Sequence, residues 1–148
     1  MEWTLRHLNK LGKIDGDLSF EFSVKFPQGL KYKGAAPKRV ADLKVCPKGK
    51  TNDCTYFEFK SVSEVPPPPF NDQFVKDLLN GDVKKLNQLK WVFDGKKFPE
   101  GYDFKGKMKE AIRKMDMPKE ALEKFGARTE DELKTEIINN FDNIFQVK

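Results

Sequence analysis

The stretch that decides the fold is VADLKVCPKGKTNDCTYFEFK, residues 40–60. Apolar and polar residues alternate through much of 39–45 and again through 55–62, and this period of two is typical of β-strands. The residues between them, 47–53, are polar and include Pro and Gly, which indicates a loop. Two strands joined by so short a loop predict an antiparallel hairpin.

Two cysteines bracket that loop and indicate a register for the hairpin. If Cys46 faces Cys54, then Asp42 faces Glu58, because each acid lies four residues from a cysteine along its strand. Facing residues have Cβ atoms roughly 4.5–5.5 Å apart. The cysteines themselves leave three interpretations open: a cross-strand disulfide, free thiols in a reducing compartment, or a coincidence of composition.

The facing acids Asp42 and Glu58 would repel each other unless a cation lies between them or one of them is protonated. Mg²⁺ or Mn²⁺ is the natural cation for such a pair, because both are hard ions that prefer oxygen ligands. Glu58 and Lys60 share one face of their strand, since strand side chains repeat every two residues. The Lys60 amine would then lie beside the metal, where it could orient a water molecule or neutralise charge on a phosphate.

An Asp followed on the next strand by Glu-x-Lys resembles the signature of the PD-(D/E)xK nuclease superfamily, which has the restriction-endonuclease fold. Here the signature is Asp42 and, after fifteen intervening residues, Glu58-Phe59-Lys60, without the leading proline. The segments TYFEFKSVSE, NDQFVKDLL and LNQLKWVFDGKK are also similar to restriction-endonuclease-type toxin domains of bacterial polymorphic toxins. This second resemblance covers about residues 39–97.

By that resemblance the chain is expected to be a metal-dependent DNase toxin domain, an endodeoxyribonuclease that uses Mg²⁺ or Mn²⁺ to hydrolyse phosphodiester bonds. Such domains are usually the C-terminal part of a larger toxin that the producing cell secretes, and they act in the cytoplasm of a target cell. A dedicated immunity protein neutralises the toxin in the producer. DNA and a cognate immunity protein are therefore the partners that the resemblance implies.

The resemblance also implies roles for individual residues. Asp42 and Glu58 would ligate the metal, together with the backbone carbonyl of Phe59, and Lys60 would activate water. Gln73 matches a helix glutamine that in such folds points back toward the site, and a solvent-facing position on the helix is the alternative.

Three other polar residues are weighed for a place in the site. Glu2 could match the acid that many of these nucleases carry on the first helix, or it could be an exposed terminal residue. Glu21 lies on the polar face of an expected strand over 18–26 and is a rival acid. His7 is the only histidine of the chain and lies on an amphipathic helix expected over 2–11, where a surface or partly packed position is expected.

The chain has 148 residues, a length typical of one domain. Its longest uninterrupted apolar run is Trp91-Val92-Phe93, so no membrane-spanning segment is expected. Lys and Arg outnumber Asp and Glu by 28 to 23, which favours an anionic partner only weakly. Basic residues concentrate at 31–50 and 84–109, on either side of the candidate site. Those expected to hold nucleic-acid phosphates are Lys38, Arg39, Lys44 and Lys90.

The remaining segments predict a small mixed sheet flanked by helices, which is an α/β (α+β) fold with a restriction-endonuclease-like core. After the hairpin we expect a helix capped by Asn71 or Asp72. It should end near Asn80-Gly81, and a short strand should follow over 89–93.

The rest of the chain is expected to be helical. The expected helices cover about 104–115, 117–125 and 130–145. A single nuclease toxin domain over 1–148 would thus have a core over about 1–97 and a helical C-terminal extension over about 104–148.

Two other functions remain open on the sequence. A basic α/β domain could bind nucleic acid or an acidic protein without cutting anything, and the same fold could act as an RNase. Metal dependence separates the first from a nuclease, because a binding module keeps its partner in EDTA and leaves it intact. Parallel digestion of DNA and RNA separates the second.

Overall fold

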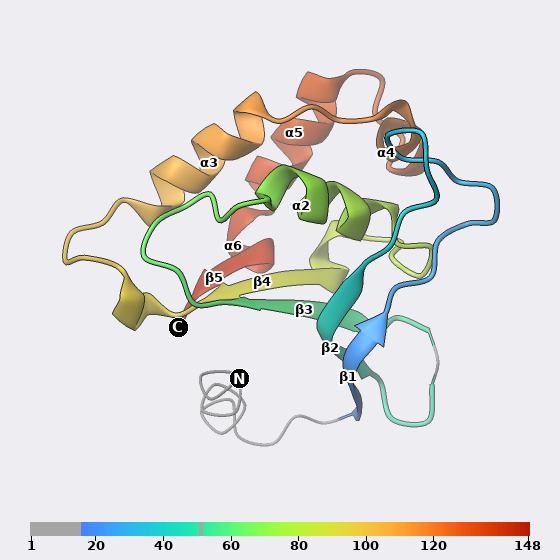
Figure 1. Ribbon diagram of the computed structural model, residues 1–148, viewed down its shortest axis with the longest axis horizontal. Coiled ribbons are helices and arrows are strands. Elements are labelled where there is room, and N and C mark those ends of the chain that lie inside the picture. Colours follow the sequence, from blue (N-terminus) through green and yellow to red (C-terminus); the bar gives the residue numbers. More distant parts are fainter. Residues whose placement is uncertain (1–15, 51) are drawn as a thin grey trace.

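The computed structural model describes residues 16–50 and 52–148, which contain a five-stranded mixed β-sheet (Figure 1). The strands are β1 Asp17–Ser23, β2 Val40–Cys46, β3 Thr55–Lys60, β4 Leu89–Phe93 and β5 Phe145–Val147. They follow one another across the sheet in chain order. The β1–β2 and β2–β3 pairs are antiparallel, whereas the β3–β4 and β4–β5 pairs are parallel.

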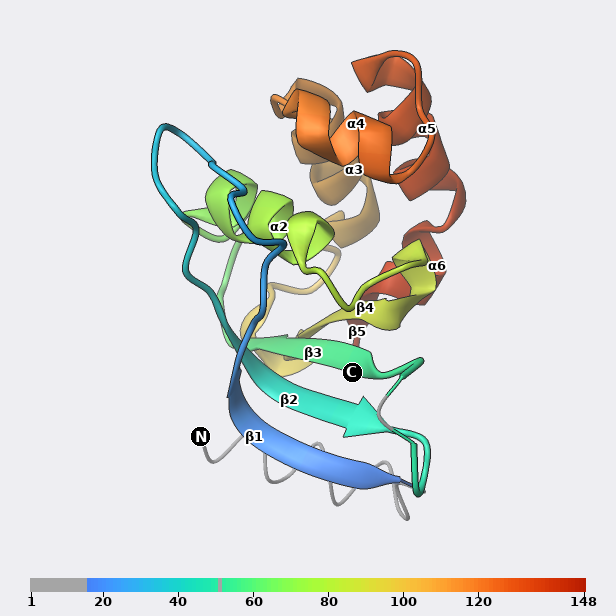
Figure 2. The same cartoon turned by 90° about the vertical axis from the view of Figure 1, so that its right-hand side faces the viewer.

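The α-helices of these two ranges lie on one side of the sheet (Figure 2). They are α2 Phe70–Leu79, α3 Phe104–Lys114, α4 Lys119–Lys124, α5 Glu130–Asn139 and α6 Phe141–Ile144. The expected mixed α/β (α+β) class is therefore confirmed. Among these helices none combines the length and the apolar character that crossing a bilayer requires.

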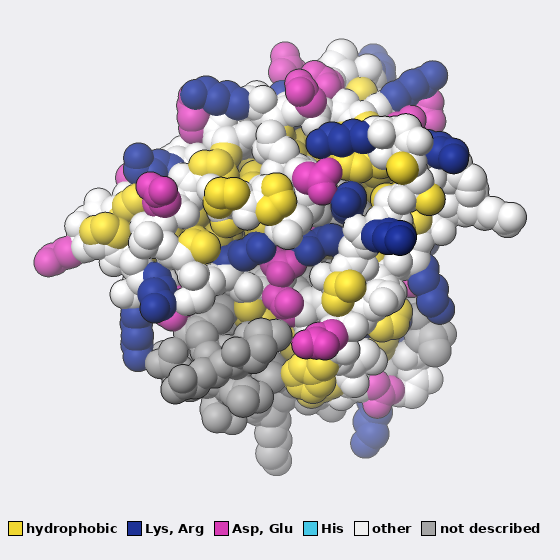
Figure 3. All heavy atoms as spheres, viewed as in Figure 1, with side chains coloured by type: hydrophobic (Ala, Val, Ile, Leu, Met, Phe, Trp, Pro, Cys, Tyr) yellow, Lys and Arg dark blue, Asp and Glu magenta, His cyan; other side chains and the backbone are white. Residues whose placement is uncertain are grey.

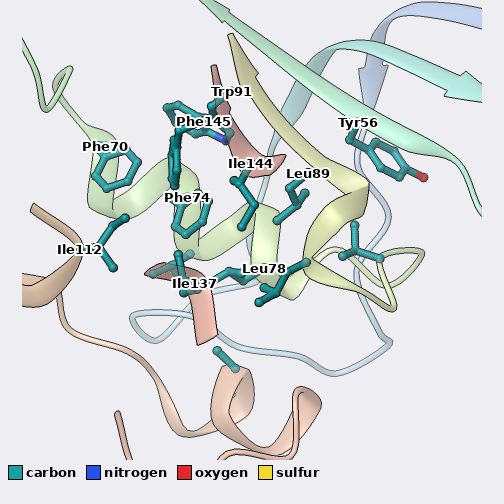
Figure 4. Close-up of a cluster of buried hydrophobic side chains, with 14 of the residues drawn as sticks. Tyr56, Phe70, Phe74, Leu78, Leu89, Trp91, Ile112, Ile137, Ile144 and Phe145 are labelled. Atoms are coloured by element: carbon teal, nitrogen blue, oxygen red, sulfur yellow. The ribbon is translucent and has the colours of Figure 1, made fainter. Parts of the chain in front are cut away.

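The sheet face that the helices cover carries the main apolar core (Figure 4). Trp91 of β4 is 1 % exposed, and its ring meets Phe70 and Phe74 of α2 edge-on at 5.3 and 5.9 Å between centroids. Ile112 of α3 and Ile137 of α5 are fully buried in the same cluster. The C-terminal helices thus share one core with the strands instead of forming a second one.

The opposite face of the sheet has a smaller apolar cluster. Leu43, Phe59 and Val92 are its buried members, and Val45 and Phe57 pack against them. Because strand side chains alternate, the residues between these project toward the helices. This alternation puts Glu58 and Lys60 on the helix-covered side of β3.

The β2–β3 hairpin has the predicted register. Leu43 pairs with Phe57, and Val45 pairs with Thr55. At the loop end Cys46 and Cys54 form a disulfide, so the first of the three interpretations of the cysteines is the one that the structure contains. Strands β2 and β3 begin and end within one or two residues of the strands predicted over 39–45 and 55–62.

Helix α2 connects β3 to the parallel strand β4 and begins two or three residues earlier than predicted. It starts at Phe70 after Pro69, without a side-chain cap, so the prediction of Asn71 or Asp72 as the cap was wrong. The physical reason is packing, because Phe70 is 2 % exposed and stacks on Phe74. The predicted end near Asn80 is confirmed.

A lysine from α4 stabilises the C-terminal end of α2. Lys124 Nζ donates to the backbone oxygen of Leu78 at 2.7 Å and to that of Asn80. These carbonyls have no partner within the helix, and a cation suits the negative end of the helix dipole. The contact anchors the helix that faces the candidate site.

The chain beyond Glu130 departs from the single helix expected over 130–145. Helix α5 ends at Asn139, the short α6 follows, and the chain then pairs with β4 as strand β5. Phe145 lies opposite Trp91 in this pairing and is 3 % exposed. Burying Phe145 between the sheet and the helices outweighs the helical spacing of the apolar residues.

Strand β1 is less buried than its alternation predicts. Leu18 and Phe20 are 42 % and 53 % exposed, and the strand ends at Ser23 instead of continuing to Phe26. Glu21 has a φ of 48°, a left-handed conformation that interrupts the regular alternation. The helix expected over 2–11 lies outside the described residues.

Candidate functional site

The two predicted acids meet where the β2–β3 pairing stops. Leu43 and Phe57 are the last paired residues, and Asp42 and Glu58 are the next on each strand. Asp42 Oδ2 accepts the backbone N–H of Phe59 at 2.8 Å, so the carboxylate substitutes for a ladder partner. The Asp42 carboxyl also lies close enough to Glu58 to help raise the pKa of that residue. The register inferred from the cysteines thus delivers both acids to one place.

The predicted lysine and glutamine complete this group. Lys60 Nζ donates to Gln73 Oε1 of α2 at 2.8 Å and lies 4.0 Å from Glu58 Oε1. The amine also lies over the ring of Trp91, 5.4 Å from its centroid. Gln73 therefore points toward the site, and the solvent-facing alternative does not hold.

Arg39 lies in this group rather than on an open surface. Its Nε donates to Asp77 Oδ1 at 2.9 Å, and one terminal nitrogen contacts Glu58 Oε2. The Arg39 and Glu58 side chains are each only 8 % exposed, and that of Asp77 is 10 % exposed. A guanidinium held in this way faces two carboxylates of the chain itself, which differs from the phosphate-binding position expected for Arg39.

Asp77 is the site residue that the sequence analysis missed. Trp91 Nε1 donates to its Oδ2 at 2.9 Å, opposite the guanidinium of Arg39. The sequence does contain an indication that Asp77 belongs to the site, because Asp77 lies four residues after Gln73 and so shares its face of α2. Its neighbours Phe74 and Leu78 are also buried, and an acid on the apolar side of a helix needs a partner.

The electrostatics of the group are dominated by burial. Burial raises the pKa of Glu58 to about 8, and Asp42 acts in the same direction. Arg39 and Lys60 lower the pKa of Glu58 but offset only part of this effect. Burial also raises the pKa of Asp77, against the opposing influence of Arg39 and the Trp91 N–H.

In the space-filling view, acidic side chains lie between basic ones in the middle of the face where α2 runs above β3 (Figures 1 and 3). Lys60 is the most exposed of the ion-paired side chains of the group, at 16 %. The group is thus packed on most sides and reaches solvent mainly at the lysine.

The other predicted basic residues are distributed over both faces of the sheet. Lys38 is exposed next to Arg39. Lys44 shares the Asp42 face of β2, and its Nζ lies 4.0 Å from the ring centroid of Phe22. Lys90 alternates with Trp91 and so projects from the opposite face of β4, and its Nζ donates to the backbone oxygen of Asn143 in α6 at 2.5 Å. The structure therefore does not bring Lys90 to the site.

Of the two rival acids, the structure describes Glu21, which lies outside the group. Glu21 is exposed on β1, in the left-handed conformation described above. Glu2 and His7 lie outside the described residues. Glu58 is the acid of the site whose carboxylate lies 4.0 Å from the Lys60 amine.

The site offers few side chains that could ligate Mg²⁺. Within residues 16–50 and 52–148 there is no cluster of three or more His, Cys, Asp or Glu side chains that could hold a metal. Asp42 and Glu58 supply two carboxylates, and Mg²⁺ is commonly held by one or two carboxylates with water and substrate phosphates as the other ligands. Phe59 contacts Asp42 through its backbone N–H. The role expected for Phe59 is a different one, in which its backbone carbonyl ligates the metal. The pair fits a Mg²⁺ ion that keeps much of its water shell.

Comparisons of the chain with family models, with curated proteins and with solved structures found no match.

Proposed function

We propose that the chain is a Mg²⁺-dependent phosphodiester hydrolase that cuts DNA, with a restriction-endonuclease-like core. The observation that carries the proposal is the meeting of Asp42, Glu58 and Lys60 at one end of the hairpin, where Glu58 has a raised pKa. Perturbed carboxylates beside a lysine are typical of sites that perform chemistry. The group also matches the Asp and the Glu-x-Lys of the PD-(D/E)xK signature, without its leading proline.

Asp42 and Glu58 are the residues that would hold the metal. When bound, Mg²⁺ would supply Lewis-acid stabilisation of phosphate charge and lower the pKa of a bound water. The Phe59 N–H holds Asp42 Oδ2, so this carboxylate is oriented before any ligand arrives. Preorganised ligands avoid the cost of ordering at the moment of reaction.

Lys60 is the candidate catalytic residue that the chain itself provides. Its ammonium group would lie beside the scissile phosphate, where it would stabilise the charge that develops on the phosphoryl oxygens and orient the attacking water. Gln73 fixes the amine by accepting its hydrogen bond at 2.8 Å. The Lys60 amine also lies over the ring of Trp91, and this cation–π contact further limits its freedom.

DNA is the proposed substrate because basic residues adjoin the site, namely the exposed Lys38 and the half-buried Lys44. Lys38 and Lys44 lie on the same segment as Asp42, and Lys44 shares its face of β2. Cations of this kind bind backbone phosphates without reading sequence. By the stated resemblance, the domain would be a bacterial toxin secreted as part of a larger protein, active in the target-cell cytoplasm and neutralised by an immunity protein.

Plasmid digestion tests this proposal. The chain should nick or linearise plasmid DNA in Mg²⁺, and EDTA should stop the reaction. Glu58→Gln should remove the activity, because it deletes one of two metal-binding carboxylates, while Glu64→Gln changes an exposed acid nearby and should leave it intact. Circular dichroism should show both variants folded.

The same experiment decides between the alternatives. Cleavage of RNA but not of DNA would identify an RNase, and binding that persists in EDTA without cleavage would identify a binding module. If Glu58→Gln cuts plasmid as fast as the parent chain, the proposed site is wrong.

A further inference from the structure

The starting observation is that one guanidinium lies between acids of two different elements. Arg39, just before β2, contacts Glu58 of β3 through a terminal nitrogen and Asp77 of α2 through Nε at 2.9 Å. The same terminal nitrogen lies 3.4 Å from Asp77 Oδ2. The guanidinium therefore divides its donors between a carboxylate expected to hold metal and one that is not.

The charges of the group explain why a cation is present there. Counted as ionised, three carboxylates (Asp42, Glu58 and Asp77) face two cations (Arg39 and Lys60), which leaves one negative charge in a mostly buried volume. A divalent ion would change this balance to one positive charge, and a bound phosphodiester would then neutralise it. Without a divalent ion, Arg39 is the cation in direct contact with Glu58.

We propose that Arg39 is an internal cation that competes with the divalent metal for Glu58, and that Asp77 sets the metal affinity by holding the guanidinium when it leaves Glu58. The inference rests on the proposed function, because it takes Glu58 as a metal ligand. Arg39 and Asp77 are positioning residues in this scheme and touch neither metal nor substrate.

The movement of the Arg39 guanidinium that this exchange requires is small. Arg39 already bonds Asp77 Oδ1 through Nε, and its terminal nitrogen is close enough to Oδ2 that a slight rotation of the guanidinium would complete a two-bond pair. Asp77 is held for this role by the Trp91 N–H at 2.9 Å. The Trp91 ring lies 5.8 Å from the centre of the guanidinium and gives it a flat surface to move along.

The scheme predicts opposite effects for two substitutions. Asp77→Asn keeps an oxygen for the Trp91 N–H but removes the charge that draws Arg39 away from Glu58, so Mg²⁺ should bind about tenfold more weakly. Arg39→Gln removes the competing cation, so Mg²⁺ should bind about tenfold more tightly. A purely structural role for the pair predicts weaker binding in both variants.

Calorimetric titration of each folded variant with MgCl₂ alone, at one pH above 8, measures these affinities without reference to cleavage. Asp72→Asn is the matched control, because it changes an acid of the same helix that pairs with Lys76 and Lys33 instead. Its affinity for Mg²⁺ should equal that of the parent chain.

A double variant keeps the test valid if Arg39→Gln alone leaves Asp77 unpaired and does not fold. Adding Arg39→Gln to Asp77→Asn removes both charges together, and it should raise the affinity above that of Asp77→Asn. Unchanged affinity in Asp77→Asn, or equal weakening in all these variants, would overturn the role of Arg39 while leaving the nuclease proposal standing. A parent chain whose Mg²⁺ binding does not depend on Glu58 would overturn both.

Discussion

The two ends of the β2–β3 hairpin share one register but differ in how the strands are held together. At the loop end, Cys46 and Cys54 are joined covalently and Val45 pairs with Thr55. At the other end the pairing stops, and Asp42 uses its carboxylate to hold a backbone N–H of the neighbouring strand. We call the first the closed end, because a covalent bond between Cys46 and Cys54 fixes it, and the second the open end, where Asp42 and Glu58 are the proposed metal ligands.

From this difference we expect the closed end to contribute mainly to stability and the open end to contribute mainly to the proposed chemistry. Buried carboxylates are costly, so the open end needs the cations Arg39 and Lys60 to compensate for Asp42 and Glu58. The closed end supplies the rigidity that keeps those acids opposite each other. The predictions below test whether the two ends divide their tasks in this way.

The largest effect is expected at the open end, on catalysis. Lys60→Met should lower plasmid cleavage in Mg²⁺ by about 100-fold or more, because it removes the cation proposed to stabilise the phosphoryl charge. Lys44→Met is the control, since it removes a basic side chain from the same sheet face and should cost about tenfold or less through weaker DNA binding. Equal losses in the two variants would mean that Lys60 only binds the backbone.

The next effect concerns the stability of the open end. Asp77→Ala should lower the free energy of unfolding by about 3–5 kcal/mol, because it leaves the Arg39 guanidinium without one of its two buried partners. Urea denaturation monitored by tryptophan fluorescence measures the loss. Asp72→Ala breaks more exposed ion pairs on the same helix and should cost about 1 kcal/mol or less.

At the closed end, loss of the disulfide should affect stability and spare the chemistry. Replacing both Cys46 and Cys54 by Ala opens a short loop, for which chain entropy predicts a cost of about 2.5 kcal/mol. Reduction of the parent chain with dithiothreitol should cost a similar amount in urea denaturation. The cleavage rate of the folded variant should stay within about twofold of the parent rate; a collapse of the rate in protein shown to be folded would mean that the disulfide itself sets the site geometry.

The smallest effect is a pH dependence that belongs to the open end. The pKa of Glu58 is raised to about 8 in the fold from an ordinary value of 4.5, so the folded chain binds this proton more tightly than the unfolded chain. The contribution of Glu58 to the free energy of unfolding is therefore complete below about pH 4.5 and is lost as the pH rises toward 8. In EDTA the free energy of unfolding should therefore fall across this window by at most about 1.4 kcal/mol per pH unit, the limit for a single proton.

The Glu58→Gln variant tests whether Glu58 causes this pH dependence of the free energy of unfolding. It cannot ionise, so urea midpoints measured across the same pH window should change less than those of the parent chain. A parent and a variant with identical pH profiles would assign the dependence to another group.

How much of this site was predictable differs from residue to residue. Asp42, Glu58 and Lys60 came from local rules, namely alternation within a strand and a register marked by two cysteines. Gln73 was identified by resemblance and confirmed in its direction. Arg39 was recognised as basic but assigned to the surface, because its two acidic partners lie 19 and 38 residues away along the chain.

The secondary-structure elements were also predictable to different degrees. The strand over 89–93 and the end of α2 near Asn80 were predicted closely, because turn residues mark both. Strand β5 was expected to be helical, since its Phe145 continues a helical spacing of apolar residues. The segment becomes a strand because Phe145 pairs with Trp91 of β4, and that pairing joins segments far apart in the sequence.

The sequence by itself determined the hairpin, its register and the face on which Glu58 and Lys60 project, because these follow from the two-residue period of a strand and from neighbours along the chain. The tertiary structure alone decided that Arg39 is enclosed by Glu58 and Asp77. The reason is physical: a charge in a low-dielectric interior is stable only beside an opposite charge, and that partner is supplied by the packing of α2 on the sheet.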